Sequence, residues 1–240
     1  MADIRFVQAD TLKEKPADVS KVGFGRVFTD YMFEMDYNPE EGWHDARIVP
    51  YQDVPLSPAN ATLHYGQAIF EGCKAYRYEG GKAVVFRAKD HIARLNRSAK
   101  ILDIPEVDEK LVYDALMKLI DLEKDWIPDG PGQSLYIRPF IFSTDPYLGV
   151  SVGQYYKMMI ILSPVGAYYA NGFAPVKIMV EDTYVRAPKG GLGAAKTPAN
   201  YAASLHGGLI AHEKGYDQTL WTDGIEHKYI GEVGSMNILF

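Results

Sequence analysis

The most diagnostic segment of this chain is GGLGAAKTPANY, residues 190–201. It surrounds one lysine, Lys196, with glycine and alanine, and places Tyr201 five positions later. Small neighbours let a lysine amine approach a bound ligand closely, and a desolvated amine loses its proton more readily and attacks carbonyl groups. Lys196 is therefore a candidate for a Schiff base with an aldehyde cofactor. Taken alone, however, a lysine in a glycine-rich loop is more often a solvated surface group. The segment is not a phosphate-binding P-loop, because Ala195 rather than glycine precedes the lysine.

Composition limits the class of protein. The 240 residues are 47% apolar and 23% charged, which is ordinary for a globular protein of one or two domains. A net charge of −6 argues against a nucleic-acid partner. No apolar run is long enough to cross a membrane, and the N-terminus lacks the apolar stretch of a signal peptide. The single cysteine, Cys73, excludes an internal disulfide and favours a reducing compartment. We expect a cytoplasmic protein with no metal site.

Periodicity predicts mixed α/β structure in the first part of the chain. Asp90 and Asp108 are the expected N-caps of two amphipathic helices, each followed by apolar residues at helical spacing. Alternating or β-branched runs predict strands at residues 74–78, 82–87, 135–142 and 155–162. The first two flank Glu79-Gly80-Gly81 and should form a hairpin.

The second part begins after a segment rich in glycine, proline and tyrosine, residues 163–175, which is typical of a connection between domains. A strand is expected at residues 176–180, and Asn200 should cap a helix that Gly215 closes. Asp223-Gly224 predicts a short hairpin turn. The sequence stops within an apolar run, residues 235–240, so we expect the chain to be the first part of a longer protein.

Three further groups of residues suggest a small-molecule site. Glu232 follows a predicted strand and could hold the ring nitrogen of a pyridine cofactor. Arg94 lies on a predicted helix and could bind phosphate. Aromatic side chains beside glycines could line an apolar pocket, with Tyr136 and Arg138 on one side of a strand. Each has an ordinary alternative, namely a surface carboxylate, a solvated helix face or core packing.

Together these segments resemble the branched-chain amino acid aminotransferases, which are fold-type-IV enzymes that use pyridoxal phosphate. The similar stretches are residues 24–32, 64–72, 93–98, 135–139, 163–168, 190–201 and 232–237. The resemblance implies an α/β fold (with α+β elements) of two domains. The small N-terminal domain would be residues 1–163, the connection residues 164–175, and an incomplete cofactor-binding domain residues 176–240.

The resemblance also implies roles for individual residues in binding pyridoxal 5'-phosphate. Lys196 would form the Schiff base and then act as general base and acid of the proton shift. Tyr201 would hydrogen-bond the phenolic oxygen of the cofactor, and Glu232 would hold its ring nitrogen. Arg94 would contact the phosphate, and Ser235 would lie near cofactor or substrate.

The implied substrate site is aromatic. Tyr65, Phe70, Tyr136 and Tyr168 would line the pocket for an aliphatic side chain. Arg138 and Lys74 would help shape the site for the acidic co-substrate.

The implied reaction transfers the amino group of leucine, isoleucine or valine to 2-oxoglutarate, giving branched-chain 2-oxo acids and glutamate. Such enzymes are commonly homodimers, and residues 147–153 are our candidate for a loop that reaches the partner. The alternatives are another fold-type-IV enzyme, such as a D-amino acid aminotransferase or an aminodeoxychorismate lyase, or a non-catalytic truncated fragment. One departure from the family lies beside the lysine: Pro198-Ala199 replaces the usual Gly-Gly, which predicts an altered loop.

Overall fold

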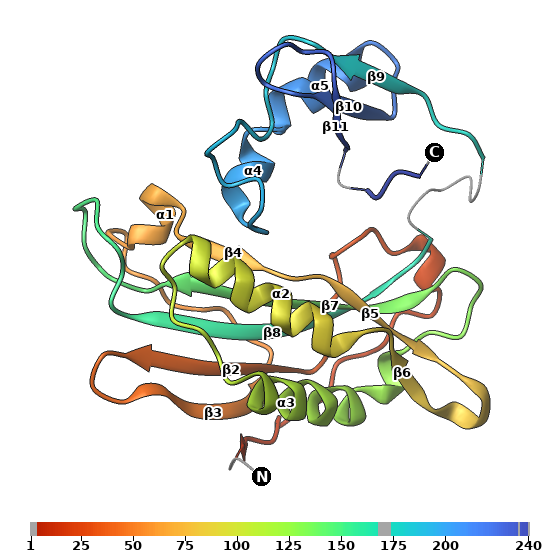
Figure 1. The fold of residues 1–240 in the computed structure, drawn as a ribbon. Helices are drawn as coiled ribbons and strands as arrows, with labels where there is room; N and C mark the ends of the chain where they lie inside the picture. The colour runs from red at the N-terminus through yellow and green to blue at the C-terminus, as the bar shows by residue number, and fades with distance from the viewer. Residues whose placement is uncertain (1–3, 168–173, 235, 240) are drawn as a thin grey trace. The chain divides into compact units, whose positions relative to one another are not determined.

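The computed structural model describes residues 4–167, 174–234 and 236–239. The chain divides into two compact units, unit 1 with residues 1–172 and unit 2 with residues 173–240. Within the described ranges, unit 1 holds an eight-stranded sheet and unit 2 a three-stranded sheet, and both carry helices (Figure 1). The predicted α/β class is confirmed. The expected domain bounds of 1–163 and 176–240 remain predictions.

Unit 1 is built on a sheet with the strand order β1-β3-β2-β8-β7-β5-β6, and β4 also pairs with β7. Its paired strands are antiparallel except for β1 and β3, which are parallel. The predicted hairpin is confirmed as β5–β6, and the two long predicted strands are β7 and β8. The strands are β1 (Arg5–Phe6), β2 (Tyr31–Asn38), β3 (Gly42–Pro50), β4 (Ala68–Phe70), β5 (Cys73–Arg77), β6 (Ala83–Val85), β7 (Ser134–Ser143) and β8 (Tyr156–Val165).

The helices of unit 1 are α1 (Ala61–Tyr65), α2 (Ala88–Ile101) and α3 (Glu109–Leu122), with 3-10 turns η1 (Val19–Lys21), η2 (Glu79–Gly81) and η3 (Lys124–Trp126). Asp108 caps α3 as predicted, because its carboxylate accepts the backbone N–H groups of Lys110 and Leu111 at 2.8 and 3.0 Å. The predicted cap of α2 is wrong. Arg87 is the N-cap, and Asp90 lies in the first turn, where its carboxylate accepts the Arg87 Nε–H at 2.8 Å.

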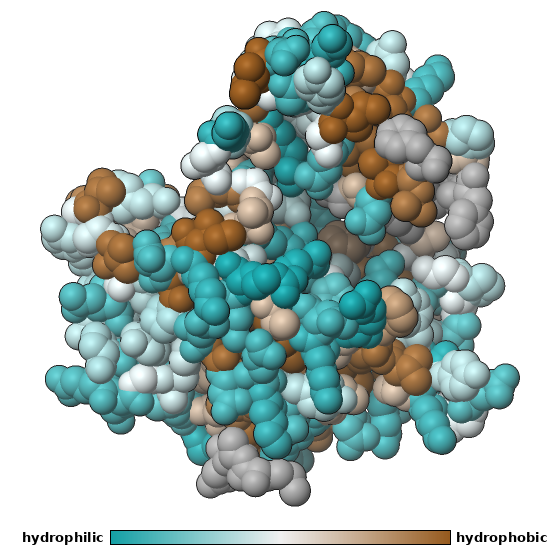
Figure 2. Space-filling view, viewed as in Figure 1, coloured by the Kyte–Doolittle hydropathy of each residue, from teal (hydrophilic) through white to brown (hydrophobic). Residues whose placement is uncertain are grey.

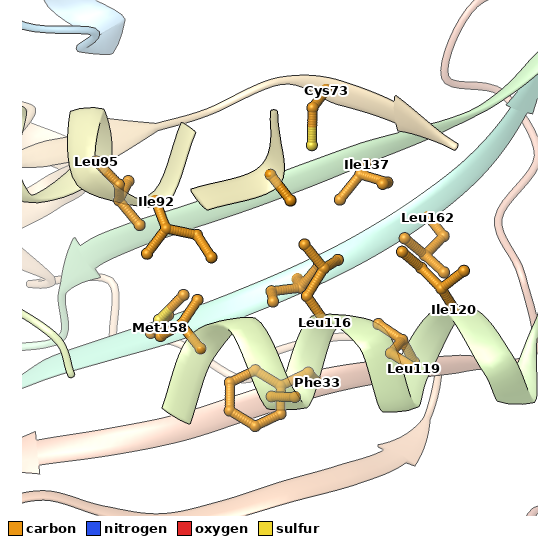
Figure 3. Close-up of a cluster of buried hydrophobic side chains, with 14 of the residues drawn as sticks. Phe33, Cys73, Ile92, Leu95, Leu116, Leu119, Ile120, Ile137, Met158 and Leu162 are labelled. Atoms are coloured by element: carbon orange, nitrogen blue, oxygen red, sulfur yellow. The ribbon is translucent and has the colours of Figure 1, made fainter. Parts of the chain in front are cut away.

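Helices α2 and α3 cover one face of the sheet (Figure 1). Their buried side chains point toward Phe33, Ile137, Met158 and Leu162 of the strands (Figure 3). Their outer surface is mainly hydrophilic (Figure 2), as amphipathic helices require. Because successive strand residues point to opposite faces, the even-numbered residues of β7 face away from these helices. That second face carries the smaller apolar cluster of Met32, Val49, Ala68, Phe142 and Met159.

Unit 2 contains a sheet of order β11-β10-β9, with β9 (Ile178–Glu181), β10 (Gln218–Thr222) and β11 (Ile230–Val233). Strand β10 is parallel to β9 and antiparallel to β11. Parallel neighbours need a crossover connection, and here it holds the Lys196 loop followed by α4 (Pro198–Ala202) and α5 (Leu205–Glu213). The lysine loop is therefore positioned by the sheet on one side in sequence and by two helices on the other.

Two expectations near Lys196 are corrected. Thr197, rather than Asn200, is the N-cap of α4, and the single predicted helix is two helices. Asn200 lies inside α4, and its Nδ2 donates instead to the carbonyls of Leu192 and Ala195, both at 2.8 Å. Pro198 occupies the first turn of α4, where a missing N–H costs no helical hydrogen bond. The proline thus begins a helix rather than distorting the loop.

The connection between β10 and β11 also differs from the expected two-residue turn. Strand β11 starts only at Ile230, and the Asp223 carboxylate accepts the backbone N–H groups of Ile225, Glu226, Lys228 and Tyr229. A short acceptor that satisfies several amides stabilises a longer loop, and a two-residue pattern does not reveal this. Gly215 follows the end of α5 with a φ of +80°, as predicted for a helix-closing glycine. No helix within the described ranges combines the length and apolar character needed to cross a membrane.

Candidate active site

The Lys196 amine is held by the ring hydroxyl of Tyr201. Nζ donates to Tyr201 Oη at 2.7 Å and lies 5.2 Å from the centre of the ring. The lysine is flanked by Ala195 and Thr197, which are 5% and 0% exposed. The two Asn200 hydrogen bonds close the loop from Leu192 to Ala195 around it. A partly buried amine with a phenol partner is suited to covalent and proton-transfer chemistry.

Glu232 is paired with an arginine that the sequence analysis did not single out. Arg186 Nη1 lies 2.5 Å from Glu232 Oε2, and the Arg186 guanidinium carbon lies 5.8 Å from the centre of the Tyr201 ring. These contacts link Lys196, Tyr201, Arg186 and Glu232 into one group within unit 2. Arg186 is only 8% exposed, and a buried arginine requires an acidic partner. Its position just before the glycine-rich loop was the available signal.

A cavity of about 390 Å³ adjoins the Arg186–Glu232 pair. Lys189, Trp221 and Asp223 also line it, and all of its lining residues belong to unit 2. Its size falls in the range of small-molecule sites. Neither Lys196 nor Tyr201 lines it, so the cavity lies beside the acid and arginine rather than beside the amine.

Arg94 of unit 1 is held by a buried glutamate. Its Nε and Nη2 donate to Glu71 Oε1 and Oε2 at 2.5 and 2.8 Å, and His91 Nδ1 lies 2.9 Å from Glu71 Oε2. Glu71 follows β4 directly, whereas His91 and Arg94 lie one turn apart on α2. Burial alone would raise the pKa of Glu71, but the hydrogen bonds from Arg94 and His91 outweigh it and hold that pKa below its usual range.

The predicted substrate residues of unit 1 share the sheet face opposite α2 and α3. Arg138 Nη2 donates to Tyr136 Oη at 2.8 Å, and its guanidinium carbon lies 4.5 Å from the Phe70 ring centre. Lys74 pairs with Tyr136 across β5 and β7, so it lies on that face too. A side chain at Gly72 would collide with the Tyr136 hydroxyl, which explains the glycine.

Three predicted residues are not brought into these groups. The Tyr65 hydroxyl donates to the Leu148 carbonyl in the loop between β7 and β8. Tyr168 and Ser235 lie outside the described residues. The structure thus forms a lysine group in unit 2, and an arginine group and an aromatic group in unit 1.

Comparison with known proteins identifies the family. The family model for amino-transferase class IV matches residues 68–240. The chain is 53% identical over 238 residues to a protein of Staphylococcus epidermidis named as a probable branched-chain-amino-acid aminotransferase, covering 99% of this chain and 66% of that protein. It therefore spans just under two thirds of the length of this relative.

Two solved structures are similar in fold. A branched-chain amino acid aminotransferase from Escherichia coli has a TM-score of 0.67 and 31% identity, covering 85% of this chain and 62% of that one. A second branched-chain amino acid aminotransferase, solved with pyridoxamine 5'-phosphate and assigned to the organism abbreviated T.th., has a TM-score of 0.65 and 25% identity, covering 83% and 62%. Because the family model matches well over half of the sequence, this chain belongs to the class IV amino-transferases.

Proposed function

We propose that the protein containing this chain transfers the amino group of leucine, isoleucine or valine to 2-oxoglutarate, giving branched-chain 2-oxo acids and glutamate. One observation carries the proposal. Lys196 Nζ lies 2.7 Å from Tyr201 Oη, in contact with a group that also contains Glu232. Relatives named branched-chain aminotransferases, 53–56% identical to this chain, support the substrate class.

The residues of unit 2 fit the cofactor of this family. Class IV aminotransferases use pyridoxal 5'-phosphate, which when bound supplies an electron sink that acidifies the Cα–H bond of an amino acid. Lys196 would hold its aldehyde carbon, Tyr201 its phenolic oxygen and Glu232 its ring nitrogen. The positive charge of Arg186 at 2.5 Å favours the ionised form of the Glu232 carboxylate, the form needed to hold a protonated ring nitrogen. Arg94 would bind the phosphate, because guanidinium groups match phosphate oxygens in pairs.

Lys196 then moves the proton. As a neutral amine, Nζ takes the proton from Cα of the amino acid, and as an ammonium group it returns that proton one position away. The Tyr201 hydroxyl orients Nζ during both transfers through their 2.7 Å contact. The closed loop around Lys196 limits the positions that the amine can reach.

Substrate selection would fall to unit 1. Phe70 and Tyr136 offer an apolar surface for a branched side chain, together with Tyr65 and Tyr168. Arg138 Nε is a buried N–H group without a hydrogen-bond partner among the described residues, and it would suit a carboxylate of the acidic co-substrate. Lys74, across the ladder from Tyr136, would add positive charge there.

We also propose a cytoplasmic homodimer. Tyr147, Leu148, Val150 and Val152 are 58%, 58%, 84% and 54% exposed, and an apolar loop of this kind is typical of a protein contact. Burial, with a contribution from Glu71, raises the pKa of the Cys73 thiol to about 12, so it suits a reducing compartment but does not require one. Sedimentation of the full-length protein tests the dimer.

Three substrates separate the candidate functions. The full-length protein should transaminate L-leucine with 2-oxoglutarate, and activity restricted to D-alanine or aminodeoxychorismate would show one of the other class IV enzymes. The visible absorbance band formed with pyridoxal phosphate should disappear in Lys196→Ala. The absence of both band and turnover in the wild-type protein would show a non-catalytic chain and defeat the proposal.

A further inference from the structure

The Glu71 carboxylate is the most deeply buried charged group next to a proposed ligand-binding side chain. Its side chain is 0% exposed, yet it contacts Arg94 through both oxygens, His91 through Oε2 and the Gly72 N–H at 3.2 Å. A buried carboxylate is stable only when its oxygens are paired. Glu71 is therefore fixed by the core of unit 1, and its contacts determine where Arg94 can lie.

Arg94 is in the opposite situation, because its side chain is 45% exposed. The pair uses Nε and Nη2, two positions on the same edge of the planar guanidinium. A bidentate contact fixes both the position and the plane of this group, which a single contact does not. The side chain is thus anchored at a buried point while much of it remains accessible. An ion pair that served only to tie β4 to α2 would not need an accessible member.

We propose that Glu71 is the positioning residue for Arg94, fixing the plane of its guanidinium so that it can bind the cofactor phosphate. This inference rests on the proposed function, in which Arg94 binds that phosphate. Glu71 does not touch the cofactor in this scheme. It reduces the conformational freedom that Arg94 would otherwise lose on binding, which is the usual benefit of preorganisation.

The test compares ligands with and without phosphate in the full-length protein. Pyridoxamine phosphate and pyridoxamine differ only in that group, and neither needs the Lys196 amine to form a bond, so their affinities can be measured by calorimetry. Glu71→Gln keeps the shape of the side chain but removes its charge. We expect it to weaken pyridoxamine phosphate about ten- to a hundredfold and to leave pyridoxamine within a few-fold of wild type.

The matched control is Glu123→Gln, which alters another buried carboxylate of unit 1, 1% exposed, whose contacts are with Tyr31 and Asp30 rather than Arg94. It should change neither affinity. In an Arg94→Ala background the Glu71 substitution should also lose its effect on pyridoxamine phosphate, because the residue that it positions is gone.

Each remaining outcome decides the question. Equal losses for both ligands would show a purely structural ion pair, and an unchanged phosphate affinity would overturn the inference outright. If Glu71→Gln does not fold, Arg94→Lys replaces it, because lysine keeps the charge but cannot make the two-point contact. Wild-type affinity in Arg94→Lys would then overturn the inference. Failure of the wild-type protein to bind pyridoxamine phosphate would instead reject the proposed function itself.

Discussion

Each unit contains an arginine–glutamate pair at its proposed site, and the two pairs are opposite in burial. In unit 1 the acid is buried, with Glu71 at 0% and Arg94 at 45% side-chain exposure. In unit 2 the arginine is buried, with Arg186 at 9% and Glu232 at 40%. In both pairs the buried member is the anchor, and the accessible member carries the charge that a ligand can reach.

The sign of the accessible charge matches the proposed ligand group. An accessible arginine is suited to an anionic phosphate, and an accessible carboxylate to a protonated ring nitrogen. The comparison predicts that accessible members act on the ligand directly, and that buried members act only through their partners. Substitutions in the two pairs should therefore affect different measurements.

The largest effect should come from Glu232→Gln. An amide cannot balance the charge of a protonated ring nitrogen, so we expect the rate of transamination of L-leucine to fall by about a thousandfold. The affinity for pyridoxamine phosphate should change little, because Arg94 is intact. Single-turnover kinetics and calorimetry on the full-length protein measure the two quantities. Arg94→Ala should show the reverse pattern, and a shared pattern in both variants would break the comparison.

Removing the buried anchor of unit 2 should have a smaller effect. Arg186→Met takes away the partner of Glu232 and the guanidinium near the Tyr201 ring. We expect the rate with L-leucine to fall about ten- to a hundredfold, with no change in the preference for pyridoxamine phosphate over pyridoxamine. Arg77→Met, which removes an arginine paired with Asp129 in unit 1, is the control and should leave the rate unchanged. A loss of phosphate preference in Arg186→Met would contradict the assignment.

These anchors also mark the limit of what the sequence predicts. Periodicity located the long strands β7 and β8 and the Asp108 cap, because hydrophobic spacing and local capping are encoded over a few neighbouring residues. Resemblance identified Lys196, Tyr201, Glu232 and Arg94. It did not identify Arg186 or Glu71, whose roles depend on contacts between residues distant in the chain.

The errors have the same origin. Asn200 has the residue type of a helix cap, but its amide donates to the carbonyls of Leu192 and Ala195 instead. Asp223 has the residue type of a tight turn, but four backbone amides of a longer loop compete for its carboxylate. In both cases, a side chain able to make several local hydrogen bonds made a different set from the expected one.

The Asn200 contacts give a third prediction, on stability. Asn200→Ala leaves two backbone carbonyls of the lysine loop without this partner, and we expect it to lower the free energy of unfolding by about 1–3 kcal/mol. Chemical denaturation measures this, and Asn237→Ala, at an exposed position of unit 2, is the control. The lysine loop should also become more susceptible to proteolysis. Unchanged stability would show that the two hydrogen bonds do not hold the loop.

The smallest effect should separate two buried carboxylates of unit 1. Burial of Glu71 is outweighed by Arg94 and His91, which lower its pKa, whereas burial and the nearby Asp30 raise the pKa of Glu123 to about 7. The ordinary pKa of such a group is 4.5. Between pH 4.5 and about 7 the folded protein binds more protons at Glu123 than the unfolded chain does. The stabilisation from protonated Glu123 is therefore complete below pH 4.5 and is lost as the pH rises through about 7.

Glu123→Gln removes this titration but keeps an oxygen that can accept the Tyr31 N–H. The variant should exceed wild type in free energy of unfolding at pH 8, by roughly 1–2 kcal/mol, and the difference should shrink toward pH 5. Urea denaturation at both pH values measures it. Glu71→Gln should have the opposite sign, because a carboxylate with a lowered pKa stabilises the folded protein above pH 4.5 and loses that effect as the pH falls. If Glu123→Gln were less stable than wild type at pH 8, the ionised form of Glu123 would be satisfied by its surroundings. The contrast between a paired and an unpaired buried acid in unit 1 would then disappear.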